Sequence, residues 1–245
     1  MRAIFLLLAF TAAALAGRGF NGSSQYISGG SVPTTTLPIT TACWFKAANV
    51  TASGSLVSLS TNAGTARYTM SVRGDIVGDP LRAAAVNSGG TAGQASTSTS
   101  YTAGVWHHAL AIYSSSTSRT IYLNGAGSGT NTTSITVGTG INRTLTGAQI
   151  LTTVQDFFNG SIAEVGIWGV ALDAGEISAL ASGFSPRLIR PASLLYYAPL
   201  VGTPRDLYGM ALTDNSTTAA DHVRIFGSTA LVRAWLRPIC LLPIR

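Results

Sequence analysis

The chain has 245 residues, enough for one large or two small domains. Charged residues make up only 10% of it, compared with ~25% in typical soluble domains. The only lysine is Lys46, and charged residues that favour helix formation are scarce. This composition excludes a helical bundle, a coiled coil and a charge-rich disordered chain. Its many Ser, Thr and Gly residues suit short strands joined by turns.

The net charge is +6 and comes almost entirely from arginine. A basic chain can indicate nucleic-acid binding. Here the arginines are scattered, and no run of Lys or Arg occurs. Only the end of the chain, after Asp221, carries arginines without acids. We therefore expect no nucleic-acid partner.

Residues 1–16 have the features of a secretory signal peptide. Arg2 precedes an apolar run over residues 4–10, and Ala14-Leu15-Ala16 fits a cleavage site before Gly17. A buried N-terminal element and an extension from a misassigned start codon are the alternatives. The run is shorter than the ~20 residues of a membrane-spanning helix. We therefore expect a secreted protein without a transmembrane anchor.

From Gly17 onward, short alternating runs are separated by clusters of turn residues. They predict strands over residues 25–28, 40–46, 55–60, 68–72, 82–86, 106–113, 120–123, 135–137, 145–150 and 160–168. Asn124-Gly125 is a strong signal for a tight turn. Many short strands at about ten-residue spacing predict an antiparallel β-sandwich or jelly roll.

One short helix is predicted after these strands. Leu172, Glu176, Ile177 and Leu180 recur at helical spacing. Asp173 occupies the N-cap position, and Glu176 follows it at the spacing of a capping box. The two acids are therefore better explained as caps than as catalytic carboxylates.

The sequence changes character after Gly183. Four prolines interrupt the next stretch, and strands are predicted over residues 194–197 and 223–226. Residues 231–245 combine large apolar side chains with arginine, as in a tail that docks on its own domain or on a neighbour. We divide the chain into residues 1–16, a jelly-roll domain over 17–183, and a C-terminal extension over 184–245.

The two cysteines leave two interpretations open. Cys43 and Cys240 could pair in an oxidising compartment. Cys43 also alternates with Thr41 and Phe45 on one strand face, as expected for a small buried hydrophobe.

Several segments, taken in order, resemble the LamG-like family of jelly rolls, which is of the laminin G and concanavalin A type. The matching segments are FNGS at 20–23, TACWFK at 41–46, WHHA at 106–109, YLNG at 122–125, FNGSIAEVGIW at 158–168 and LDAGEISAL at 172–180. The resemblance implies an all-β, antiparallel jelly-roll β-sandwich with one short helix. The Ser- and Thr-rich character also resembles versions found in phage and prophage proteins.

A further motif of the family lies at an unusual place. LYYAPL at 195–200, followed by DLYG at 206–209, resembles a motif that often opens a unit of this family. Here it comes last. It either packs back as closing strands or completes a neighbouring subunit.

The family resemblance also implies which residues an enzyme of this fold would need. Related glucanases carry paired carboxylates on one strand face, because glycoside hydrolysis requires two acids. No such arrangement occurs here, so we expect no enzymatic activity. His107 and His108 are adjacent and point to opposite faces of a strand, so they cannot share one metal ion.

Many relatives bind calcium, but this chain lacks acidic residues at the positions that the resemblance implies for the calcium site. The acidic positions of the family are Asn21 and Ala163 here, which removes charge from the implied site. Asp75, Asp79 and Asp156 remain as loop carboxylates that could bind calcium, or could be solvated turn residues. We expect no cofactor, with calcium as the open alternative.

Sugar binding needs aromatic faces and polar side chains on loops carried by a rigid sandwich. The candidate ligand-binding residues are Tyr101, Asn142, Arg143, Asp156 and Phe157.

The leading hypothesis is a non-catalytic binding module, extracellular or on a virion surface, that recognises glycans or a surface protein. The alternative is a structural coat, decoration or filament subunit that assembles through its termini, including residues 184–245. A polysaccharide-active enzyme comes third.

Overall fold

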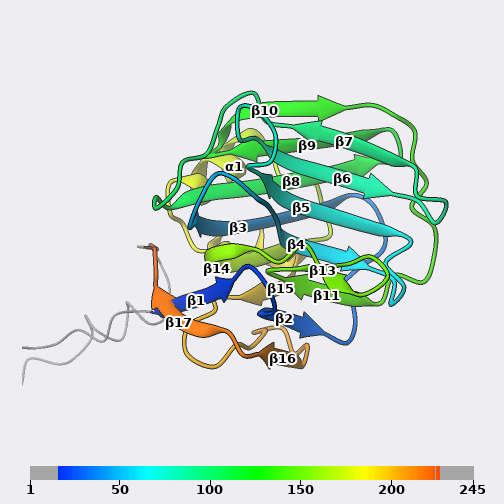
Figure 1. Cartoon of the computed structure of the whole chain (residues 1–245). Coiled ribbons are helices and arrows are strands. Elements are labelled where there is room, and N and C mark those ends of the chain that lie inside the picture. Colours follow the sequence, from blue (N-terminus) through cyan, green and yellow to red (C-terminus); the bar gives the residue numbers. More distant parts are fainter. Residues whose placement is uncertain (1–15, 224, 227–245) are drawn as a thin grey trace, which may run out of the picture.

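The computed structural model describes residues 16–223, 225 and 226. These residues form two large antiparallel sheets packed face to face, with a single α-helix (Figure 1). The predicted all-β jelly-roll sandwich is therefore confirmed. The predicted signal sequence lies outside the described residues, except that Ala16 begins the first strand.

The larger sheet has eight strands. Seven follow the order β10-β9-β8-β3-β14-β1-β17, and β15 pairs with β14 beside this path. Their bounds are β1 Ala16–Asn21, β3 Ile39–Ala47, β8 His107–Ser115, β9 Ser118–Leu123, β10 Ala126–Asn131, β14 Asn159–Trp168, β15 Leu194–Ala198 and β17 Thr218–Asp221.

The smaller sheet has seven strands in the order β16-β2-β11-β4-β5-β6-β7. Their bounds are β2 Tyr26–Gly29, β4 Ser53–Ser60, β5 Arg67–Arg73, β6 Leu81–Val86, β7 Ala92–Ser96, β11 Arg143–Thr146 and β16 Leu212–Asn215. β12 (Gln149–Ile150) and β13 (Val154–Gln155) form a separate two-stranded hairpin, whose strands pair with neither large sheet.

Side chains that alternate along the strands fill the space between the two sheets. Phe45 and Ile121 of the larger sheet meet Leu59 and Met70 of the smaller one, and all four are fully buried. Since alternate residues point to opposite faces, the intervening residues of β4, β5 and β6 lie on the outer face of the smaller sheet.

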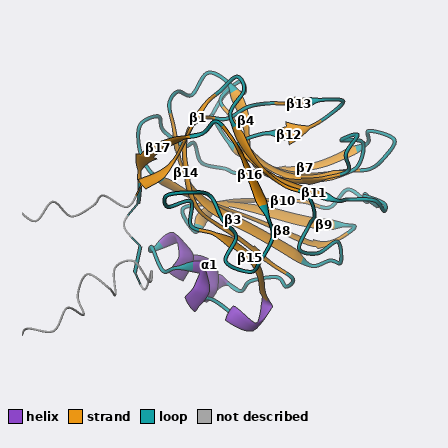
Figure 2. Cartoon of the chain, turned by 90° about the horizontal axis from the view of Figure 1, so that it is seen from below, coloured by secondary structure: helices purple, strands orange, loops and turns teal. Residues whose placement is uncertain are grey.

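Helix α1 (Ala174–Ala181) covers the outer face of the larger sheet, on the side away from β12 and β13 (Figure 2). Ile177 and Leu180 pack there with Trp168 and Leu172. The predicted capping box is confirmed: Asp173 accepts from the Glu176 amide at 3.0 Å, and Glu176 accepts from the Asp173 amide at 2.8 Å. Two short 3₁₀ turns follow, η1 Pro186–Leu188 and η2 Pro191–Ser193.

The chain after η2 returns to the same sandwich. β15 pairs with β14, β16 with β2, and β17 with β1, so this segment adds strands to both sheets. Asp206 fixes the connecting turn, because its carboxylate accepts from the amides of Tyr197, Tyr208 and Met210 at 2.8, 3.1 and 2.9 Å. The LYYAPL motif therefore contributes a closing strand in its own chain.

Cys43 lies in the sandwich core with no exposed surface, and burial raises the pKa of its thiol. Cys240 is outside the described residues, so a disulfide between the two stays a prediction. Within the described part of the chain, no helix is long and apolar enough to cross a membrane.

Candidate functional site

A pocket of about 340 Å³ opens on the outer face of the smaller sheet. Strands β4, β5, β6 and β7 form its floor, and the β12–β13 hairpin forms one wall. The volume lies within the ~300–1,000 Å³ range of small-ligand sites.

Small side chains leave the floor hollow. Ser71 lies between Ser55 on β4 and Arg82 on β6, and Thr69 lies opposite Ala84. The pocket is also lined by longer side chains, including those of Arg67, Arg73 and Arg82, so the small side chains form a depression between them. The hydroxyls of Ser55, Ser58 and Ser60 on β4 are buried without a hydrogen-bond partner in the described structure, and these three residues do not line the pocket.

Asp156 holds the hairpin wall against the sheet. Its backbone lies in the left-handed region, with φ of 55°, and its carbonyl accepts from the Ser55 amide at 2.9 Å. Its carboxylate accepts from the Ser53 hydroxyl at 2.6 Å and from the Gln149 side-chain amide at 2.9 Å. The carboxylate is therefore oriented by two donors, and it also lines the pocket.

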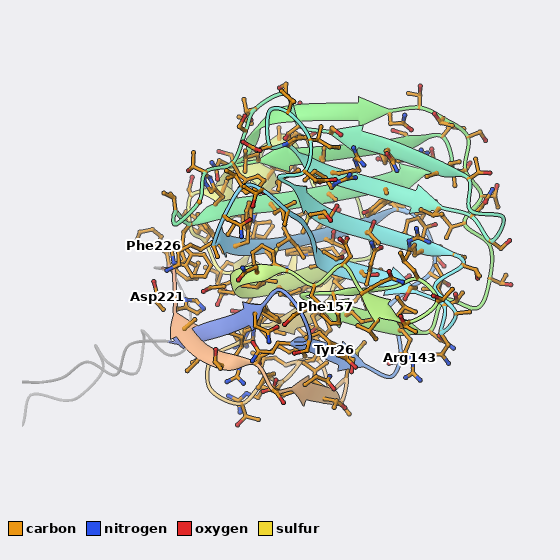
Figure 3. All side chains as sticks on the ribbon, in the orientation of Figure 1. Tyr26, Arg143, Phe157, Asp221 and Phe226 are labelled. Carbon is orange, nitrogen blue, oxygen red and sulfur yellow. The ribbon has the colours of Figure 1, made fainter. Side chains whose placement is uncertain are left out.

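An apolar cluster fixes the base of the same hairpin. Leu145, Ala148 and Ile150 are buried, and Tyr26 and Phe157 pack against them. The rings of Tyr26 and Phe157 lie beside each other, 6.1 Å apart between centroids (Figure 3). This cluster positions the polar wall without contributing an aromatic ring to the pocket itself.

Three arginines line the pocket, and they differ in their partners. Arg73 donates from Nε and Nη2 to the two carboxylate oxygens of Asp75, at 2.7 and 2.6 Å. This ion pair holds the pKa of Asp75 below its usual value. Arg67 donates to the Gly64 carbonyl at 2.7 Å; burial lowers its pKa, and the nearby Asp156 opposes that effect. The side chain of Arg82 makes no hydrogen bond or ion pair with the described residues, and its Nε is buried without an acceptor.

The pocket is thus lined by hydroxyl, amide, guanidinium and carboxylate groups. Among the described residues that line it, none is aromatic and Asp156 is the only acid. These groups can bind and orient a polar ligand. They do not supply the pair of carboxylates that glycoside hydrolysis requires.

Of the five predicted ligand-binding residues, only Asp156 lines this pocket. Tyr101 is instead a core residue with 1% of its surface exposed, packed edge-on against Phe45, and burial raises its pKa to about 12. Asn142 and Arg143 lie where β11 begins, and Arg143 bonds to Asn62. Figure 3 shows Arg143 at the margin of the sandwich.

The predicted calcium ligands do not gather into one site. Asp75 is occupied by Arg73, Asp79 lies in a loop with φ of 41°, and Asp156 is in the pocket wall. No group of three His, Cys, Asp or Glu residues in the described part of the chain could hold a metal ion. The carboxylates present therefore do not fit a calcium site built from these three residues.

The adjacent histidines have separate structural roles. His107 bonds to Asn124 through Nδ1 and to Thr102 through Nε2, both at 3.0 Å. His108 points to the other face and is buried against Trp44. Burial lowers the pKa of His108 to about 3, so its ring is neutral at physiological pH.

Sequence reasoning missed the residues of the pocket floor, although a signal for them is present. Arg67, Thr69, Ser71 and Arg73 recur at every second position of one strand, and Arg82 lies on the same face of the next. Such a polar row opposite a buried apolar row marks the solvent-facing side of a strand. The hairpin that turns this face into a pocket gave no comparable signal.

Comparison with known proteins gives the family. Residues 21–178 match the model of the concanavalin A-like lectin/glucanases superfamily. The chain belongs to this family, as the resemblance implied. No curated protein matches the chain by sequence.

Solved structures share the fold at low identity. A heptameric SAP-like pentraxin from Limulus polyphemus is 16% identical with a TM-score of 0.61, over 84% of this chain and 94% of that one. A putative carbohydrate-binding protein from Bacteroides ovatus is 16% identical with a TM-score of 0.58, over 85% of this chain and 60% of that one. The CBM40 domain of a Ruminococcus gnavus sialidase, bound to α2,3-sialyllactose, is 14% identical with a TM-score of 0.53, over 69% of this chain and all of that one.

Proposed function

We propose that this protein is a non-catalytic glycan-binding module and that its binding site is the pocket over β4–β7. The observation that carries the proposal is a hollow, ready-made pocket on a rigid sheet, lined by hydroxyl, amide, guanidinium and carboxylate groups. A sugar carries many hydroxyls and can form hydrogen bonds with these lining groups. The carbohydrate-binding proteins among the structural neighbours support the same class of ligand.

The absence of paired acids favours binding over hydrolysis. Asp156 stands alone among the described pocket residues, and the nearby Asp75 is held in an ion pair outside the lining. The sialyllactose of the Ruminococcus gnavus domain belongs to that protein and assigns no sugar here.

The position of the described chain ends suits a displayed module. β1 and β17, which lead to these ends, lie side by side at one end of the sandwich, and β7 lies away from them (Figures 1 and 2). A module attached through either end would leave the pocket accessible. An extracellular or virion-surface location is part of this proposal.

A glycan array with the full chain, followed by calorimetric titration of the hits, tests the proposal. Ala84→Phe places a ring on the pocket floor and should abolish binding. Ala126→Phe, at an exposed position of β10, is the matched control and should bind as the native protein does. Absence of any glycan hit, or equal binding by Ala84→Phe, would contradict the proposal.

A second candidate, assembly with other subunits, has its own observation. Phe184, Leu188, Leu195 and Phe226 are between 37% and 53% exposed, and the rings of Phe184 and Phe226 lie 6.1 Å apart. Exposed apolar side chains of this kind are typical of interaction surfaces. Sedimentation of the native protein and of Leu188→Asp tests it: self-association should be present in the first and lost in the second.

A further inference from the structure

We infer that the pocket selects acidic glycans, namely sugars that carry a carboxylate or sulfate group, and that Arg82 is the main anchor of that anion. This inference rests on the proposed function and names its ligand class. It follows from the placement of the three arginines, their unequal pairing and the groups that the pocket lacks.

The strand register gives the position of the arginines. Arg82 lies directly across from Ser71, and Arg73 is two residues beyond Ser71 on the same face of β5. Such a diagonal pair of positions is roughly 7–8 Å apart, within reach of long side chains. Arg67 lies four residues before Ser71, on the same face. An anion above Ser71 is therefore flanked by Arg73 and Arg82, and the rest of a sugar extends toward Arg67.

The charges around the pocket do not cancel. Three guanidinium groups face two carboxylates, those of Asp156 in the lining and Asp75 beside it. Asp75 neutralises Arg73 through two hydrogen bonds, and Asp156 is the acid that acts on Arg67. Arg82 is the cation without an acid among the described residues, so the unbalanced positive charge lies at its end of the pocket.

Buried donors point to the same ligand chemistry. The Nε atoms of Arg67 and Arg82 are buried and have no acceptor within the described structure. An unsatisfied buried donor is costly, and one on a charged group more so. Carboxylate and sulfate oxygens match the planar guanidinium and accept two parallel hydrogen bonds from it. Rotation of the Arg82 side chain toward such a group would satisfy its donors.

The missing groups argue against a neutral sugar as the preferred ligand. Protein sites commonly bind sugar faces through aromatic rings. No aromatic ring lines this pocket in the described chain. Its remaining polar groups, including Gln94, Gln149 and the Asp156 carboxylate, can bond to sugar hydroxyls. The pocket must therefore distinguish one sugar from another through charge and hydrogen bonding. In this arrangement, the acidic substituent of the sugar binds Arg82.

The test uses the full chain and matched sugars in calorimetric titrations. Glucuronic and galacturonic acid represent carboxylates, galactose 6-sulfate represents sulfate esters, and glucose and galactose are the neutral parents. The acidic members should bind more tightly than their parents, and added salt should weaken them selectively. Arg82→Gln should reduce acidic binding by roughly tenfold or more. Arg205→Gln removes an exposed arginine outside the pocket and should have no effect.

The outcomes separate this inference from the proposed function. Loss of acidic binding in Arg82→Gln and in Ala84→Phe supports both. Equal binding of neutral and acidic sugars, blocked by Ala84→Phe but unchanged in Arg82→Gln, overturns the acidic preference and leaves the glycan-binding pocket standing. Acidic binding that survives Ala84→Phe, or falls equally in Arg82→Gln and Arg205→Gln, shows a diffuse charge effect and overturns the assignment to this pocket. Comparing the affinities of the uronic acids and of galactose 6-sulfate shows whether the pocket prefers a carboxylate or a sulfate group.

Discussion

Glu164 and His222 form a buried ionisable pair in which each side chain is 2% exposed. His222 Nε2 lies 3.3 Å from Glu164 Oε1, and the Tyr197 hydroxyl donates to Glu164 Oε2 at 2.7 Å. Glu164 is at a bulge of β14 with φ of 57°, and His222 follows directly after β17. The pair therefore connects the end of β17 to β14, at the centre of the larger sheet.

The stability that His222 contributes should fall as pH rises. Burial alone lowers the pKa of His222, but Glu164 and the carbonyls of Val223 and Pro199 together raise it above 6.5. The folded state thus binds the proton more tightly than the unfolded state. The contribution is fully present below about pH 6.5 and is lost as pH rises through the raised pKa. Urea unfolding of the native protein and His222→Gln at several pH values should give a stability difference that shrinks above neutrality. A difference independent of pH would contradict this.

His108 should have the opposite effect at acid pH. Burial lowers its pKa to about 3, so the unfolded state binds the proton first. Stability that is present above about pH 6.5 is lost as pH falls toward 3. His108→Phe removes the titrating group but keeps an aromatic ring beside Trp44. Its free energy of unfolding should fall less steeply below pH 6 than that of the native protein, and an identical fall would contradict the assignment.

Individual residues were predictable where the sequence fixes a local structure. Asp173 and Glu176 were correctly identified as caps because a capping box depends only on neighbours within one helical turn. Tyr101 could not be placed in the core by local pattern, because its burial depends on Phe45 more than fifty residues earlier. Asp156 was identified as a loop acid, but its partners Ser53 and Gln149 come from separate elements.

At the scale of elements, the capped helix and the edge strands differ in how strongly the sequence specifies them. Ile177 and Leu180 pack on the larger sheet, and Arg190 adds ion pairs to Asp173 and Glu176. The edge strands β7, β10, β16 and β17 were not predicted. β10, for example, has the sequence AGSGTN, and its side chains alternate only between exposed and half-buried. Its pairing with β9 across the Asn124-Gly125 turn makes it a strand, rather than its own hydrophobic pattern.

Three predicted strands also differ from the structure. The predicted strand 145–150 is divided at Gly147, where φ is 81°, so that β11 stays in the sheet and β12 begins the pocket hairpin. Residues 135–137 bury Ile135 and Val137 but form no strand in the described chain. Of the predicted strand 223–226, the described residues 223, 225 and 226 contribute one bridge, between Phe226 and Phe184, and no longer strand.

Loss of the helix cap should destabilise the protein measurably. Asp173→Ala removes the bond to the Glu176 amide and one ion pair with Arg190, and should cost about 1 kcal/mol of unfolding free energy. Glu176→Gln can keep the reciprocal bond to the Asp173 amide and should cost less. Urea denaturation monitored by circular dichroism measures both. Equal stability of Asp173→Ala and the native protein would show that the cap contributes nothing to the free energy of unfolding.

At the scale of the whole molecule, the chain after the helix is part of the sandwich. Leu194, Tyr196, Ala198 and Leu200 are at most 2% exposed and belong to the buried clusters. The family model ends at residue 178, before all of them. The jelly roll of this chain is therefore larger than the segment that the family match covers.

A chain that ends at residue 183 should fail to fold. Full burial of a large apolar side chain contributes ~1.5–3 kcal/mol, and several are lost together with β15, β16 and β17. That loss is comparable with the ~5–15 kcal/mol that stabilises a typical domain. The truncated chain should show no cooperative thermal transition, whereas a chain ending at residue 226 should unfold cooperatively. A cooperative, native-like transition in the shorter chain would contradict the closing role of these strands.

The central claim is that the face of β4–β7 binds sugars, and the most direct measurement maps the bound ligand on the protein. We would titrate the ¹⁵N-labelled full chain with the strongest glycan hit and record amide chemical shifts. The largest changes should fall on β5, β6 and residues 149–156, and they should disappear in Ala84→Phe. Changes centred instead on the exposed Phe184 and Phe226 surface, or none at saturating sugar, would contradict it.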